Sequence, residues 1–247
     1  DQLSLLLAAP GQLVSVSDWA VRPAASNLVE EASALGVNDG SAEEIFLLEP
    51  DLVLAGTFSD PVTVAMLRRL GLTVETVAPA TSMAGVSETI RRVGALLGRE
   101  TAAAALVEAF ETALARQVAR ADDLTREAAA YYYPNNYTSG GDTLADEVMG
   151  LAGFDNAAAA LGISGVARLP LETLVMAQPF LIRTESVSGA RRGRSYETGS
   201  HPALAAFGAE GRAATVAERW QTCGTPFVVK AVAALVDARL GALDEAP

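Results

Sequence analysis

The sequence predicts an α/β fold made of two like lobes that one long helix joins. Three observations lead to this prediction: strands alternate with helices in both halves of the chain, one helix-proline-strand unit occurs in each half, and a long helical segment separates the halves. Alternation of this kind indicates parallel sheets covered on both faces. We expect an N-terminal lobe over residues 1–97, a linking helix over 98–127 and a C-terminal lobe over 128–247.

The first half alternates between helices and strands. We expect helices over 1–9, 24–35, 42–49, 61–70 and 87–97, and strands over 12–17, 51–55 and 72–77. Proline or glycine follows most of these helices, as is typical of helix ends. Ser41 is the expected N-cap of the third helix, with Glu44 three residues later as in a capping box.

The linking helix is the segment from Arg99 to about Arg126, which contains no glycine and no proline. Its apolar residues recur with the spacing of one helical face, with a lapse at Gln117: Leu106, Phe110, Ala113, Leu114, Val118, Ala121 and Leu124. At about 1.5 Å per residue the segment would extend roughly 40 Å, more than the diameter of a small domain. Such a helix suits a connection between two bodies, although a helix packed along a single domain would show the same pattern.

The second half repeats the alternation. We expect strands over 128–133, 180–183 and 214–217, and helices over 142–151, 171–177, from 201 onward and over 226–240. Gly140-Gly141 indicates a turn, with Asp142 as the cap of the helix that follows. The polar segment 185–200 is too long for a simple connection.

One unit is repeated between the halves. Aligning Pro50 with Pro179 places EEIFLLEPDLV over ETLVMAQPFLI at a separation of 179 − 50 = 129 residues. The alignment favours two like lobes, although helix-proline-strand is a common motif in α/β proteins and eleven aligned positions can match by chance.

Composition excludes several classes of function. The formal net charge of −12 opposes binding to a phosphate backbone, so we expect no nucleic-acid partner. One cysteine and one histidine permit neither an internal disulfide nor a His-rich or Cys-His metal site. We expect no resident metal or cofactor, and any metal would arrive inside an organic chelator. No apolar run is long enough to span a bilayer.

Enzyme motifs are mostly missing. The chain has no GxSxG, P-loop or GxGxxG motif, and the glycines around Ser164 have the wrong spacing for a nucleophile elbow. His201 precedes a proline, which favours a helix entry over a catalytic base, and Cys223 has no second cysteine or histidine beside it. We expect no catalytic residues; a two-lobed α/β hydrolase or transferase that uses Ser164 or Cys223 with His201 stays the alternative.

Aromatic and arginine residues gather at strand ends and in the loops that follow. They are Trp19, Phe58, Tyr131 to Tyr133, Tyr137, Tyr196 and Trp220, with Arg191, Arg192 and Arg194. Ligands of open parallel sheets bind at the carboxyl ends of the strands. Two facing lobes would thus line a cleft with flat apolar faces and with arginines for acidic groups. At least one of Tyr131 to Tyr133 should pack in the core, and the arginines equally fit a solvated loop.

Several segments together are typical of one family. They are EEIFLLEPDLVLAGTF (43–58), LRRLGLTVETV (67–77), IRRVGALLGRETAAAALVEAFE (90–111), SGGDTLADEVMGLAGFDNAA (139–158), LPLETLVMAQPFLIRTES (169–186) and His201-Pro202-Ala203-Leu204. In them the chain resembles the periplasmic substrate-binding proteins of ABC importers for vitamin B12 and ferric siderophores, the helical-backbone class III. The C-terminal half matches more loosely, because Gln178-Pro179-Phe180 replaces the acidic Pro-Asp usual in the family.

The resemblance implies two Rossmann-like lobes with parallel sheets joined by one long backbone helix. It also implies a monomer outside the cytoplasm that captures a ferric siderophore, a corrinoid or haem between its lobes and delivers it to a membrane permease. An export signal would have been removed, and a first strand before Asp1 would be missing, because the chain opens inside the family's first helix.

The resemblance places ligand contacts in the loops Ser17-Asp18-Trp19, Gly56-Thr57-Phe58 and Arg219-Trp220. Together with the aromatic and arginine pattern, the candidate ligand-binding residues are Asp18, Trp19, Phe58, Tyr133, Tyr137, Arg191, Arg194, Tyr196 and Trp220. Family members present one acidic residue on each lobe to the permease. Here these are Asp60 in the first lobe and either Glu185 or Glu197 in the second.

Overall fold

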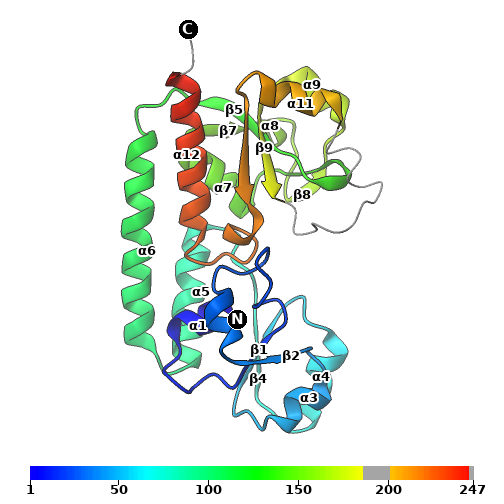
Figure 1. Cartoon of the computed structure of the whole chain (residues 1–247), viewed down its shortest axis with the longest axis vertical. Coiled ribbons are helices and arrows are strands. Elements are labelled where there is room, and N and C mark those ends of the chain that lie inside the picture. The colour runs from blue at the N-terminus through cyan, green and yellow to red at the C-terminus, as the bar shows by residue number, and fades with distance from the viewer. Residues whose placement is uncertain (186–200, 245–247) are drawn as a thin grey trace. The chain divides into compact units, whose positions relative to one another are not determined.

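The computed structural model describes residues 1–185 and 201–244. The chain forms two compact units: Asp1–Ala80 with Ala84–Glu108, and Thr81–Met83 with Ala109–Pro247. The helix α6 (Glu100–Ala121) contributes residues to both units. Each unit combines helices with parallel strands, so the predicted α/β fold of two units is confirmed. Figure 1 shows the elements of each unit.

The first unit contains two pairs of parallel strands. Its elements are α1 (Gln2–Leu7), β1 (Ser15–Ser17), α2 (Val29–Ser33), β2 (Gly36–Asn38), α3 (Ala42–Leu47), β3 (Val53–Gly56), α4 (Pro61–Arg69), β4 (Val74–Val77) and most of α5 (Met83–Leu96). β1 pairs with β2 and β3 pairs with β4. β1 ends at Ser17 and β3 ends at Gly56. The loops that the sequence analysis singled out, around Trp19 and Phe58, directly follow these two strands.

Side-chain caps fix the starts of α3 and α4. Ser41 Oγ accepts from the Glu44 backbone N–H, as predicted, while the Glu44 carboxylate accepts from the backbone N–H of Asp39 at 2.8 Å. At α4 the Asp60 carboxylate accepts from the backbone N–H groups of Val62 and Thr63, and Pro61 occupies the first helical turn. Proline is tolerated there because the first turn has no intrahelical partner for its missing N–H.

The helix predicted over 24–35 is wrong in its first half, because α2 begins only at Val29. Ser26 Oγ accepts from the Leu28 backbone N–H at 3.1 Å, and Gln2 Oε1 accepts from the Asn27 backbone N–H at 2.9 Å. These side-chain oxygens compete for amides near the helix start and favour turns over helix.

The second unit is built on a four-stranded parallel sheet. Its elements after α6 are β5 (Glu127–Tyr131), the 3₁₀ turn η1 (Pro134–Asn136), β6 (Tyr137–Ser139), α7 (Leu144–Leu151), β7 (Phe154–Asn156), α8 (Ala157–Ala160), β8 (Val166–Arg168), α9 (Leu171–Ala177), β9 (Phe180–Glu185), α11 (Pro202–Ala209), β10 (Ala213–Ala217), the 3₁₀ turn η3 (Glu218–Trp220) and α12 (Val228–Asp244). The strand order is β10-β9-β5-β7, and β6 and β8 form a separate antiparallel pair.

Helices cover both faces of this sheet. Tyr132, which directly follows β5, and Leu181 of β9 pack with Leu174 of α9 and with Leu204 and Phe207 of α11. α12 contacts β10 and α7, and Figure 1 shows it on the other side of the sheet from α9 and α11. Coverage of both faces explains why the first half of β9, Phe180 to Ile182, and the end of β5, Ala129 to Tyr131, are apolar and buried.

The helix-proline-strand unit is present in both units, as α3-Pro50-β3 and α9-Pro179-β9. The residue before each proline has a positive φ, 48° at Glu49 and 44° at Gln178. Non-glycine residues rarely adopt this conformation. The likeness of the two segments thus extends to a backbone detail that their sequences did not indicate.

Further predicted boundaries were also wrong: α5 begins at Met83, four residues before the predicted start at Ser87. α6 ends at Ala121, five residues before Arg126, and its 22 residues extend roughly 33 Å at about 1.5 Å per residue. Asp122 and Asp123 follow directly, and acidic groups are unfavourable at the negative end of the helix dipole. The cap of α7 is Thr143, whose Oγ1 accepts from the Asp146 backbone N–H; Asp142 has a φ of 61° and instead accepts from Ser164 Oγ.

None of the helices in the described part of the chain combines the length and the apolar character needed to cross a membrane.

Candidate ligand-binding loops

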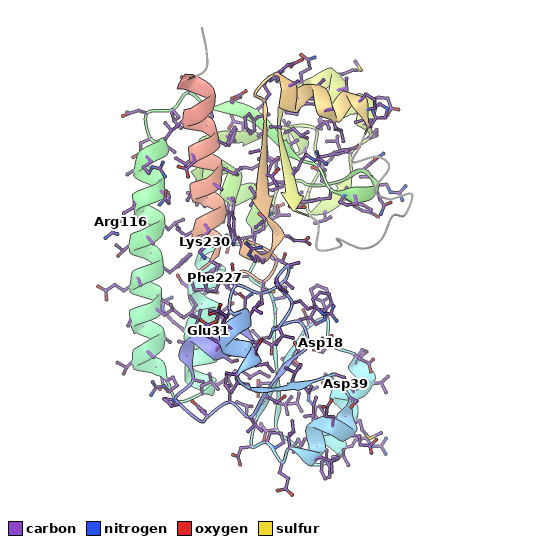
Figure 2. The ribbon with its side chains drawn as sticks, viewed as in Figure 1. Asp18, Glu31, Asp39, Arg116, Phe227 and Lys230 are labelled. Atoms are coloured by element: carbon purple, nitrogen blue, oxygen red, sulfur yellow. The ribbon has the colours of Figure 1, made fainter. Side chains whose placement is uncertain are left out.

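The loop after β1 holds an exposed tryptophan. The Trp19 side chain is 55% exposed, and the Arg22 guanidinium carbon lies 4.4 Å from its ring centroid. Arg22 also forms an ion pair with Asp18, which Figure 2 labels in this unit. The pair is exposed and contributes at most about 1 kcal/mol to stability, but it offsets the positive charge beside the ring. Asp18 thus neutralises and orients Arg22, and Arg22 covers part of Trp19.

The loop after β3 holds the most exposed large apolar side chain that the structure describes, Phe58, at 90%. The turn that carries it is closed by Ser59, whose Oγ accepts from the Gly56 backbone N–H at 3.0 Å and whose own N–H donates to the Gly56 carbonyl at 3.1 Å. The ring therefore projects from an ordered turn and packs against almost nothing in its own unit. The exposed ring is available to pack against a bound molecule.

Asp60 follows this turn and caps α4, as described above. Its carboxylate also accepts from Thr63 Oγ1 at 2.9 Å. The hydrogen bonds from Thr63 and Val62 lower the pKa of the Asp60 carboxyl, because they stabilise the charged form. The group is exposed and ionised at neutral pH, and its role in permease docking stays a prediction.

In the second unit, tyrosines cluster where β5 ends. Tyr131 is fully buried and its hydroxyl donates to Gln221 Oε1 at 3.0 Å. Its ring stacks on Tyr133 with 5.6 Å between centroids, and the Tyr133 hydroxyl is hydrogen-bonded to Ser139 Oγ at 2.9 Å. Tyr132 is also buried. The expectation that at least one of the three packs in the core is confirmed, and Tyr133 is the only one of the three that is half-buried rather than buried.

Burial raises the pKa of Tyr133 to about 12, against a lowering by the Ser139 hydrogen bond, and burial raises the pKa of Tyr131 well above its ordinary value of 10.0. Both groups therefore stabilise the fold below pH 10, and this contribution is lost as the pH rises from about 10 toward 12. We expect absorbance titration of tyrosinate to show delayed ionisation in the native protein, together with falling stability above pH 10. A titration identical to that of the unfolded chain would contradict this.

Arginines lie over two further aromatic rings of the second unit. The Arg168 guanidinium carbon is 5.7 Å from the ring centroid of Tyr137, its cross-strand partner in the β6–β8 pair. The Arg219 guanidinium carbon is 5.8 Å from the ring centroid of Trp220, in the turn after β10. Tyr137 is 37% exposed and Trp220 is half-buried. Trp19, Tyr137 and Trp220 thus share one arrangement, an accessible aromatic ring beside a guanidinium, whereas Phe58 is an accessible ring without one among the described residues.

Sequence reasoning missed Arg22 and Arg168. The three-residue spacing between Trp19 and Arg22 was a usable signal for the first. The sequence contained no signal for Arg168, because this residue lies beside Tyr137 only through the antiparallel pairing of β6 and β8.

Some candidate residues cannot be placed. Arg191, Arg194, Tyr196 and Glu197 lie outside the described residues, as does Arg192. Glu185 ends β9, and only its backbone is described. The roles suggested for them stay predictions.

The residues of the enzyme alternative have separate partners. Ser164 Oγ donates to Asp142 Oδ2 at 2.9 Å, and His201 Nδ1 accepts from the Ala203 backbone N–H as the cap of α11. Cys223 is exposed. Across residues 1–185 and 201–244, no hydrogen bond joins Ser164 or Cys223 to His201, and no three His, Cys, Asp or Glu side chains form a group that could hold a metal ion.

Two α/β units share the long helix α6, and accessible aromatic rings follow strands in both units. The model of a family described as periplasmic binding proteins matches residues 1–203. The chain belongs to this family.

Curated relatives match part of the chain. It is 33% identical to a cobalamin-binding protein of Halobacterium salinarum over 150 residues, which are 58% of this chain and 40% of the relative. It is 27% identical to the uncharacterized ABC transporter substrate-binding lipoprotein YvrC of Bacillus subtilis over 192 residues, 74% of this chain and 60% of the relative. The matched region thus spans 40% to 60% of the length of these relatives.

Solved structures of low identity share the fold. The periplasmic heme-binding protein RhuT from Roseiflexus sp. RS-1 in apo form superposes with a TM-score of 0.77 at 22% identity, over 96% of this chain and 95% of that one. The periplasmic vitamin B12 binding protein BtuF of Vibrio cholerae gives a TM-score of 0.72 at 17% identity, over 99% of this chain and 94% of that one. These likenesses establish the two-unit architecture.

Proposed function

We propose that the chain is the solute-binding component of an ABC importer, which binds an organic metal chelate outside the cytoplasm and delivers it to a membrane permease without changing it chemically. The candidate ligands are a corrinoid, haem and a ferric siderophore. The observation that carries the proposal is the exposure of Trp19 and Phe58, 55% and 90%, in ordered loops at the carboxyl ends of parallel strands. Membership of the periplasmic binding protein family supports it.

The chemistry of these loops favours a metal that is already coordinated. The described residues offer no cluster of His, Cys, Asp or Glu for a bare ion, whereas the loops offer flat aromatic faces. Such faces suit large, partly apolar solutes. Asp18 offsets the charge of Arg22, so the loop after β1 does not require a strongly anionic ligand. A corrinoid is the first ligand to test, because the relative with 33% identity is named a cobalamin-binding protein.

The test uses the two tryptophans of the chain, Trp19 and Trp220, which both lie in candidate loops. We expect saturable quenching of intrinsic fluorescence by cyanocobalamin, hemin or ferrichrome, with a dissociation constant of about 1 μM or lower, equivalent to roughly 8 kcal/mol. N-acetyltryptophanamide at matched absorbance controls for the inner-filter effect. Equilibrium dialysis with detection of cobalt or iron gives an independent affinity. Absence of binding by all three chelates would refute the proposed ligand class.

A further inference from the structure

Tyr131 joins two parts of the second unit that share no backbone pairing. It is the last residue of β5, which pairs with β7 and β9, whereas β10 pairs with β9. β9 therefore lies between Tyr131 and the turn after β10. The hydrogen bond from the Tyr131 hydroxyl to Gln221 Oε1, 3.0 Å long, connects the two strand ends directly.

The donor end of this bond is held rigidly. The Tyr131 side chain is fully buried, and its ring stacks on Tyr133 at an interplanar angle of 20°. Thr138 Oγ1 donates to the Tyr131 carbonyl at 2.7 Å, and Ser139 Oγ holds the hydroxyl of Tyr133. A phenol fixed at its backbone and along its ring presents its hydroxyl at one place.

The acceptor end belongs to a compact turn. The backbone N–H groups of Gln221 and Thr222 both donate to the Glu218 carbonyl at 3.1 Å, and Thr222 Oγ1 donates to the same carbonyl at 2.8 Å. These bonds close the turn on itself, and η3 also contacts α12. Within the turn, Gln221 directly follows Arg219 and Trp220. A displacement of its side chain therefore displaces the pair proposed to contact ligand.

We propose that Tyr131 is a positioning residue for ligand binding: its hydroxyl, through Gln221, holds the turn that carries Arg219 and Trp220 in its binding orientation. The inference rests on the proposed function, because it assigns Trp220 a contact with the chelate. Holding the turn before the ligand arrives removes part of the cost of ordering it on binding. One net hydrogen bond of about 1 kcal/mol corresponds to about a fivefold change in affinity.

The neighbouring residue, Tyr132, supplies a matched control for substitution of Tyr131. Tyr131→Phe removes the hydroxyl that reaches Gln221 and keeps the ring. Tyr132→Phe removes a hydroxyl that is equally buried and has no hydrogen-bond partner in the described part of the chain. Both variants lose one oxygen atom, and the two residues are neighbours at the end of β5. Only the first should affect the turn.

The first readout needs no ligand. In a Trp19→Phe background Trp220 is the sole tryptophan and can be excited selectively, and we expect Tyr131→Phe to increase its quenching by acrylamide and lower its anisotropy relative to Tyr132→Phe. Gln221→Leu should act like Tyr131→Phe, the double variant should add nothing further, and Gln221→Glu, which keeps an acceptor, should retain the protected state. Unchanged Trp220 signals in Tyr131→Phe, measured well below its thermal unfolding, would overturn the proposal.

The second readout is affinity with both tryptophans present. By equilibrium dialysis with cyanocobalamin, or whichever of the three chelates binds, Tyr131→Phe should bind about fivefold more weakly and Tyr132→Phe should match the unmodified chain. A changed Trp220 signal with an unchanged affinity would refute the positioning role. If no chelate binds the unmodified chain, the proposed function fails, while the ligand-free comparison still decides whether Tyr131 holds the turn.

Discussion

Gly140→Ala is expected to lower the free energy of unfolding by about 3 kcal/mol, because overpacking and broken backbone hydrogen bonds add their costs. A β-carbon at position 140 would lie 2.1 Å from the Ile163 carbonyl oxygen and 2.6 Å from its carbonyl carbon. Both atoms belong to the backbone, which cannot turn away as a flexible side chain can. The two segments are also held together by hydrogen bonds from Gly140 N to Gly165 O, Gly141 N to Ile163 O and Gly165 N to Gly141 O, at 2.8 to 2.9 Å.

Denaturant unfolding of the variant measures this cost, and Gly150→Ala is the matched control. Gly150 lies within α7, and no atom stands within 4 Å of the position its β-carbon would take. Alanine there should stabilise the protein by about 0.5 to 1 kcal/mol, since glycine weakens helix interiors. If Gly140→Ala lowers the free energy of unfolding by less than about 1 kcal/mol, the Ile163 segment moves away easily. The close approach of the two segments would then not require glycine at position 140.

The sequence predicted elements whose signals are local. The range predicted for α9, 171–177, agrees with Leu171–Ala177, and α4 ends one residue before its predicted end. Helical periodicity and N-terminal caps lie within the elements themselves, so no distant contact is needed to detect them. The sequence analysis missed β2, β6, β7 and β8, which have only three residues each. Three residues are too few to show an alternation, and these strands form through pairing with distant segments.

In the candidate loops, too, local features could be predicted from the sequence and long-range contacts could not. Trp19, Phe58 and Trp220 could be singled out because a residue type and a nearby strand end are both visible in the sequence. The contacts around these residues could not be predicted from the sequence. Gln221 and Tyr131 are 90 residues apart in the chain, and the contact between Tyr137 and Arg168 depends on the register of β6 and β8. The tight contact at Gly140 was interpreted as a simple turn, because the sequence gives no sign of the Ile163 carbonyl beside it.

Phe58→Ser is expected to weaken chelate binding by about 2 kcal/mol, or roughly thirtyfold in the dissociation constant, without measurable loss of stability. The ring is 90% exposed in the free protein, so its removal deletes almost no packing within the fold. Burial of a phenylalanine side chain is worth about 1.5 to 3 kcal/mol, and here that burial would occur only when ligand binds. Fluorescence titration and denaturant unfolding of the same variant measure the two quantities.

Leu47→Ser is the control for this substitution. Leu47 is 73% exposed in the same unit but is the last residue of α3 rather than part of a loop that follows a strand. Its replacement by serine removes a comparable exposed apolar side chain, so it accounts for general changes in surface hydrophobicity. If both variants bind equally well, Phe58 is not a ligand contact. A lower affinity in Phe58→Ser alone, at equal stability, locates the chelate at the loop after β3, because only a bound ligand can supply the packing that this ring lacks.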